Sequence, residues 1–109
     1  MKAIFVSRHQ PNADQYALCN KAGYELIHVG DLDVFSEDFE NDLDVLINVE
    51  HNAELIIGVH PMVLLVASAY GDKVGMFNNV NRAPEGEKPS FGTDKLVIMD
   101  GLVRTDVAL

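Results

Sequence analysis

The sequence lacks several residues and patterns that mark common classes of protein. Its single cysteine, Cys19, excludes an internal disulfide and a zinc-binding thiolate cluster, and it suits a reducing compartment. There is no tryptophan and only 7% of the residues are aromatic, so the core must be mostly aliphatic. The longest apolar stretch, around residues 59–69, contains His60, Pro61 and Ser68 and is too short to cross a bilayer. We therefore expect a cytoplasmic protein with no membrane segment.

Basic residues are also scarce, because eight lysines and arginines face seventeen aspartates and glutamates, for a net charge of −9. Proteins that coat DNA or RNA usually present a basic face, so we expect no bulk nucleic-acid binding. The acidic residues are concentrated in residues 31–50, which contain no Lys or Arg. We interpret this run as a solvated helix and loop, since its spacing lacks the glycine-bearing pattern of a calcium loop. Its eight acidic side chains are Asp31, Asp33, Glu37, Asp38, Glu40, Asp42, Asp44 and Glu50.

Sequence motifs for cofactors and metals are missing as well. There is no glycine-rich phosphate loop after the first apolar run, no Walker pattern and no nucleophile elbow. The histidines and carboxylates have no spacing that selects a metal. We therefore expect neither a metal nor a cofactor.

What the sequence does contain is an alternation of strand-like and helix-like segments. Apolar runs at residues 2–6, 24–29, 54–59 and 73–77 predict strands, and the first of them is interpreted as a strand rather than a secretion signal. Helices are predicted over 12–22, 38–50 and 61–69. Asn12 is the expected N-cap of the first, Gly23 follows it, and Pro61 opens the third. Asp100-Gly101 between apolar runs at 95–99 and 102–105 predicts a β-hairpin.

This alternation predicts the fold class. With 109 residues, 48% of them hydrophobic, the chain suffices for one α/β domain spanning residues 1–109. We expect a Rossmann-like, mostly parallel sheet of about four strands alternating with helices, plus the C-terminal β-hairpin. A domain this small also gains burial by pairing, so a homodimer is expected.

Ligands of parallel sheets bind beyond the carboxyl ends of the strands, which turns the strand predictions into a site prediction. The acidic run lies mostly outside this edge, so we expect a local cationic pocket that suits a phosphorylated ligand. The residues that follow the predicted strands there are Ser7, Arg8, His9, Gln10, His60, Asn78, Asn79, Asn81 and Arg82.

Each of these residues also has a structural explanation. Ser7 is about as suited to bonding the loop backbone or capping the first helix as to touching a ligand. Arg8 is favoured as an anion-binding residue over a surface ion pair, and His9 is a reasonable general acid or base. His60 is either a ligand contact or a core histidine beneath the third helix. The asparagines at 78–81 serve equally well as turn residues, and His28, inside an apolar strand, is interpreted as structural.

Two segments of the sequence resemble one known family. Residues 5–9 read Phe5-Val6-Ser7-Arg8-His9, at the end of a first strand, and residues 57–61 read Ile57-Gly58-Val59-His60-Pro61, ahead of an apolar helix. The chain resembles the small Csx-type ring nucleases associated with type III CRISPR loci, whose members begin with a similar aromatic-Val-Ser-Arg-His stretch and have a similar length.

The resemblance implies a homodimer that binds a cyclic oligoadenylate, most of all cyclic tetra-adenylate, and cleaves it without a metal. A ribose 2′-OH would attack the neighbouring phosphorus and leave a 2′,3′-cyclic phosphate, which switches off the antiviral signal. Arg8 and Arg82 would stabilise the phosphate, and Ser7 would help to position it. His9 is the first choice for proton transfer and His60 the second.

Two other interpretations remain open. Arg8-His9 after a first strand is similar to the Arg-His pair of the histidine phosphatases, but Gln10 stands where that family has Gly and the chain is short for that fold. The chain could also be a non-catalytic module that sequesters a cyclic nucleotide or binds a protein, and the acidic middle would suit a basic partner.

Overall fold

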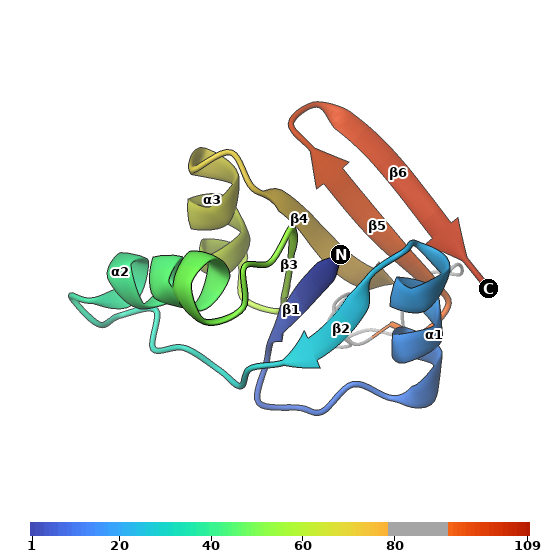
Figure 1. Ribbon diagram of the computed structural model, residues 1–109, viewed down its shortest axis with the longest axis horizontal. Coiled ribbons are helices and arrows are strands. Elements are labelled where there is room, and N and C mark those ends of the chain that lie inside the picture. Colours follow the sequence, from blue (N-terminus) through green and yellow to red (C-terminus); the bar gives the residue numbers. More distant parts are fainter. Residues whose placement is uncertain (79–91) are drawn as a thin grey trace.

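The computed structural model describes residues 1–78 and 92–109, which form a six-stranded mixed sheet with helices on both faces (Figure 1). The predictions for Asn79, Asn81 and Arg82 lie outside the described residues. In chain order the elements are β1 (Lys2–Val6), α1 (Ala13–Lys21), β2 (Glu25–His28), α2 (Phe39–Asp44), a π-helical segment η1 (Val45–Glu50), β3 (Leu55–Gly58), α3 (Pro61–Ala69), β4 (Lys73–Asn78), β5 (Lys95–Asp100) and β6 (Val103–Ala108).

The sheet order is β2-β1-β3-β4-β5-β6. The first four strands are parallel, whereas β5 is antiparallel to β4 and β6 is antiparallel to β5. An α/β fold with parallel strands joined through helices is therefore confirmed. The predicted sheet of about four mostly parallel strands is corrected to a six-stranded sheet that is only partly parallel and only partly Rossmann-like. The difference arises because the hairpin pairs along β4 and continues the sheet.

The side chains of β1 alternate between two apolar cores, as expected for a strand covered on both faces. Ala3 and Phe5 pack with α1, whose Leu18 and Cys19 are fully buried. Ile4 and Val6 pack instead with α2, η1 and α3. Both faces of β1 are thus fixed by packing, and its carboxyl end is held in one place.

The helix boundaries follow largely from local sequence chemistry. Asn12 is the N-cap of α1: its side chain accepts the Gln15 N–H at 2.9 Å, while the Gln15 side chain accepts the Asn12 N–H at 3.0 Å. Gly23 follows the helix with a φ of 91°, a conformation that glycine adopts freely. Pro61 is the first residue of α3, as predicted.

The predicted helix over 38–50 is correct in place but not in type. Its second half is π-helical: the His51 N–H reaches the Leu46 carbonyl, five residues back, at 3.2 Å. Phe39, Leu43 and Ile47 nevertheless share one buried face, at a spacing of four residues. The π-helical turn keeps Ile47 on this face, so the apolar pattern alone does not distinguish the π-helix from a regular α-helix.

The C-terminal hairpin is confirmed, with its turn one residue later than predicted. Asp100 pairs with Val103, so the loop is Gly101-Leu102 rather than Asp100-Gly101. Of the two loop residues, only Gly101 has a positive φ, 61°, which fits a two-residue loop that begins with glycine. On β6, Arg104 and Asp106 form an ion pair at 2.8 Å, and Lys95 of β5 lies 3.4 Å from the same carboxylate.

Across residues 1–78 and 92–109, none of the helices combines the length and the hydropathy needed to cross a membrane.

Candidate functional site

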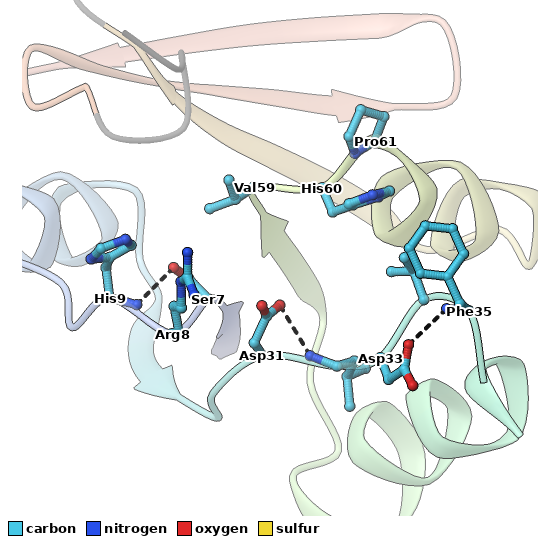
Figure 2. A pocket seen from close by; sticks show the side chains of 11 residues that line it. Ser7, Arg8, His9, Asp31, Asp33, Phe35, Val59, His60 and Pro61 are labelled. Carbon is cyan, nitrogen blue, oxygen red and sulfur yellow. Dashed lines mark hydrogen bonds between the residues drawn. The ribbon is translucent and has the colours of Figure 1, made fainter.

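The main cleft lies beyond the carboxyl ends of β1, β2 and β3 (Figure 2). From β1 the chain goes to β2 on one side, whereas β3 is followed by β4 on the other. This change of direction is the switch point at which open parallel sheets bind ligands. The cleft has a volume of about 830 Å³ and is lined by Ser7, Arg8, His9, Asp31, Leu32, Asp33, Val34, Phe35, Val59, His60 and Pro61.

The structure brings four of the predicted site residues together in this cleft: Ser7, Arg8, His9 and His60. Gln10 lies instead in a smaller hollow of about 220 Å³, which His9 also lines. Asn78, at the end of β4, does not line the cleft, and its carbonyl accepts the Asp94 N–H at 3.1 Å.

Ser7 closes the turn after β1. The residue is only 2% exposed, and its Oγ accepts the His9 N–H at 3.1 Å. The Ser7 carbonyl is hydrogen-bonded to the Nε2 atom of His28, from β2. The backbone-bonding explanation of Ser7 is thus confirmed, and His28 has the structural role predicted for it. These bonds orient the loop that carries Arg8 and His9.

Arg8 is the cationic residue that the described part of the chain contributes to the cleft. Its side chain is exposed, and no acidic group among the described residues forms an ion pair with it. Figure 2 shows Arg8 and His9 on one side of the cleft and His60 on the other. A guanidinium in this position has its donors available for an anion.

The expected local cationic pocket is corrected to one of mixed charge, because Asp31 and Asp33 line the same cleft, although the rest of the acidic run lies outside its lining. Asp31 Oδ1 accepts the Leu32 N–H at 3.1 Å, and Asp33 Oδ1 accepts the Phe35 N–H at 3.0 Å. Among the described residues that line the cleft, the carboxylates of Asp31 and Asp33 thus accompany the guanidinium of Arg8. Both aspartates follow β2 in the sequence. The rule that ligands bind beyond the carboxyl ends of parallel strands, which selected Ser7 and His60, therefore applies to them too.

His60 is the N-cap of α3. Its Nδ1 accepts the backbone N–H of Met62 at 3.0 Å, and the residue is exposed. The alternative of a core histidine is therefore wrong. Because Nδ1 uses its lone pair to accept this bond, the neutral ring carries its proton on Nε2. His60 accordingly offers a hydrogen-bond donor at Nε2.

Phe35 is a lining residue that the sequence analysis did not single out. It is 92% exposed, in the loop between β2 and α2. Leu32 and Val34 of the same loop also line the cleft, but they are partly buried and pack against the apolar core. An aromatic residue in a polar loop after a strand could have indicated a site residue. The acidic residues around it instead led to the interpretation of the whole segment as a solvated helix and loop.

Other reactive groups lie away from the cleft. Cys19 is a small, fully buried core residue, and desolvation raises the pKa of its thiol to about 12, so it is no nucleophile near neutral pH. Within residues 1–78 and 92–109, no group of three or more His, Cys, Asp or Glu side chains is arranged to hold a metal ion.

The side chains of the cleft are chemically able to bind an anion at Arg8, to donate a hydrogen bond from His60 and to transfer a proton at His9. No family model, no curated protein and no solved structure matches the chain. The function of the site must therefore be inferred from these residues themselves.

Proposed function

We propose that the chain binds a cyclic oligoadenylate, most of all cyclic tetra-adenylate, in this cleft and cleaves it without a metal ion. The products are linear and end in a 2′,3′-cyclic phosphate, and their formation switches off type III CRISPR signalling. The observation that carries the proposal is the position of Arg8, without an ion-pair partner in the described residues, beside His9 at the switch point of the sheet. The resemblance of residues 5–9 and 57–61 supplies the substrate class.

The reaction is an in-line displacement within the ring. The ribose 2′-oxygen forms a bond to the adjacent phosphorus, and the bond from that phosphorus to the 5′-oxygen breaks. The 2′-hydroxyl gives its proton to His9, and the leaving 5′-oxygen takes a proton from water in the open cleft. Arg8 neutralises the charge that develops on the phosphorane oxygens.

The two histidines have different roles in this proposal. The Nδ1 atom of His60 already accepts the Met62 N–H, and its Nε2 carries the proton of the neutral ring, so His60 lacks a free acceptor for the 2′-hydroxyl proton. It acts instead as a neutral donor to a phosphoryl oxygen. This geometry favours His9 for proton transfer, and the His28–Ser7 hydrogen bond orients the loop that carries it.

The carboxylates of Asp31 and Asp33 restrict where the phosphate can bind. A phosphate close to either carboxylate is repelled, so the reacting phosphate is placed on the Arg8 side of the cleft. The uncharged sugar and base portions of the ligand are then placed nearer to the two carboxylates.

The proposal includes a homodimer, which would match a symmetric ring. The outer face of α3 supports it: Met62, Leu65 and Tyr70 are exposed, and residues 59–71 contain no Asp, Glu, Lys or Arg in a chain of net charge −9. A hollow of about 560 Å³ over α3 shares His60 and Pro61 with the cleft. Light scattering should give twice the chain mass, and Leu65→Asp should give one chain mass; a monomeric wild-type protein contradicts this part.

The activity is proposed for the cytoplasm, where a free thiol such as Cys19 stays reduced. The test of the function is incubation of trace protein with cyclic tri-, tetra- and hexa-adenylate in EDTA, resolved by chromatography. Conversion of cyclic tetra-adenylate to a linear product with a cyclic phosphate end is the expected result. Binding without conversion would identify a sequestering module instead, and release of inorganic phosphate from a monoester would identify a phosphatase.

A further inference from the structure

We infer that Phe35 is a stacking platform for a nucleobase, so that the ligand of the cleft is a nucleotide held by its base as well as by its phosphate. The inference rests on the proposed function for the position of the phosphate at Arg8. It adds a base-binding half to the same cleft.

The first observation is the exposure of the ring. Phe35 is 92% exposed, although its neighbours in the loop, Leu32 and Val34, both pack against the apolar core. The loop thus partly buries two smaller apolar side chains and leaves the largest one exposed in the cleft. Covering an exposed phenyl ring is favourable, and a flat base provides a matching surface.

The second observation is that the backbone at Phe35 is fixed before any ligand binds. The Phe35 N–H donates to Asp33 Oδ1 at 3.0 Å, which closes a local turn. Val34, on the preceding position, anchors the loop to the core. An ordered backbone lowers the entropy cost of using the ring for recognition.

The third observation is the separation of the two ends of the cleft. Figure 2 shows Arg8 and His9 on one side and Phe35, His60 and Pro61 on the other, with Asp31 between them. The volume of about 830 Å³ lies in the range of pockets that take small ligands. A phosphate at Arg8 therefore leaves space for its sugar and base toward Phe35. Stacking accepts any base, so Phe35 selects for an aromatic ring rather than for one sequence.

The test compares adenosine 5′-monophosphate with ribose 5-phosphate, which has the phosphate and sugar but no base. Binding is measured by calorimetry on the wild-type chain and on Phe35→Ala, Phe35→Trp and Leu102→Ala. Leu102 is a matched control, because it is a fully exposed apolar residue at the hairpin turn and does not line the cleft. Since Phe35 is itself almost fully exposed, its substitution leaves the core intact.

The wild-type chain is expected to bind the nucleotide about ten-fold or more tightly than ribose 5-phosphate. Phe35→Ala should abolish this difference, Phe35→Trp should keep it, and Leu102→Ala should not change it. Equal affinities for the two ligands in the wild type, an unchanged difference in Phe35→Ala, or no binding of the nucleotide would each overturn the inference.

Turnover of cyclic tetra-adenylate separates this inference from the proposed function. If the wild type and Phe35→Ala cleave the ring with the same kcat and KM, the stacking role is wrong and the function stands. If the ring is not cleaved but nucleotide binding depends on Phe35, the function is wrong and the stacking role stands.

Discussion

The Nδ1 atom of His60 accepts the backbone N–H of Met62 at 3.0 Å, so one imidazole both caps α3 and lines the cleft. The cap satisfies an N–H that the first turn of the helix leaves without a partner. The same bond fixes the ring and directs its Nε2 away from the helix. Helix stability and ligand contact therefore depend on a single side chain.

Replacing His60 should separate these two roles. His60→Ala removes the cap and should lower the free energy of unfolding by about 1 kcal/mol, whereas His60→Asn retains a capping oxygen and should stay near the wild type. Both variants lose the Nε2 donor, so both should cleave cyclic tetra-adenylate at least about ten-fold more slowly. Urea denaturation and single-turnover assays measure the two effects, and full activity in His60→Asn would remove His60 from the reaction.

Arg8 and His9 should differ in what they contribute. Arg8→Ala should weaken ligand binding and turnover together, because the guanidinium contacts the phosphate in both the bound and the reacting states. His9→Ala should keep ligand affinity and slow turnover by about 100-fold or more, because only proton transfer is lost. Calorimetry and single-turnover kinetics distinguish the two; unchanged turnover in both variants would exclude the proposed site.

The carboxylate of Asp31 should oppose the phosphate. Asp31→Asn removes one negative charge and keeps an oxygen for the Leu32 N–H, so the loop should keep its shape. We expect binding of cyclic tetra-adenylate to tighten by about two- to ten-fold at low salt and by less at high salt. Asp100→Asn, at the hairpin and outside the cleft, is the control and should have no effect. Weaker binding in Asp31→Asn would show instead that this carboxylate accepts a hydrogen bond from the ligand.

Cys19 should make the free energy of unfolding depend on pH in the alkaline range. Burial raises the pKa of the thiol from 9.0 to about 12, so above about pH 9 the unfolded chain releases this proton while the folded chain keeps it. The unfolded state then binds fewer protons, and stability falls as pH rises, by at most about 1.4 kcal/mol per pH unit. Below this range the thiol contributes no pH dependence.

Urea denaturation of the wild type and Cys19→Ala between about pH 8 and 10.5 measures this effect. The difference between the two chains should change only above about pH 9. Parallel curves across the whole range would mean that Cys19 is not shielded from water.

Gln15 should link α1 to the segment that precedes β5. Its side chain accepts the Asn12 N–H at 3.0 Å and donates to the Gly92 carbonyl at 3.1 Å, and the residue is only 4% exposed. Gln15→Glu keeps the acceptor but loses the donor, so it should cost about 1–3 kcal/mol of unfolding free energy. The exposed neighbour variant Asp14→Asn should cost much less. Equal melting temperatures for Gln15→Glu and the wild type would contradict this link.

The sequence predicted best those features that depend on local chemistry. The Asn12 cap, Gly23 after α1 and Pro61 at the start of α3 each follow from the hydrogen-bonding or φ preference of one residue. The collection of Ser7, Arg8 and His9 with His60 followed from parallel strand direction alone.

Features that depend on tertiary packing were predicted less well. The π-helical turn of η1 keeps Ile47 on the buried face, so the apolar periodicity is the same as that of a regular α-helix and cannot distinguish the two. The hairpin extends the sheet because β5 pairs with β4, and these two strands are far apart in the sequence. Phe35 lies in the cleft while Leu32 and Val34 pack against the core, a contact that local composition did not reveal. Asp31 and Asp33, in contrast, follow β2 and could have been predicted from strand direction.

Within the described residues, the hairpin also makes β6 the border strand of the sheet, and the backbone of a border strand can recruit a strand from another molecule. The ion pairs among Arg104, Asp106 and Lys95 lie across that border strand and its neighbour. An incoming chain in register would have to accommodate these charges, and glycine at the turn keeps the two strands closely joined. Charged side chains on β5 and β6, away from the cleft, would thus oppose edge-to-edge pairing of the sheets of two molecules.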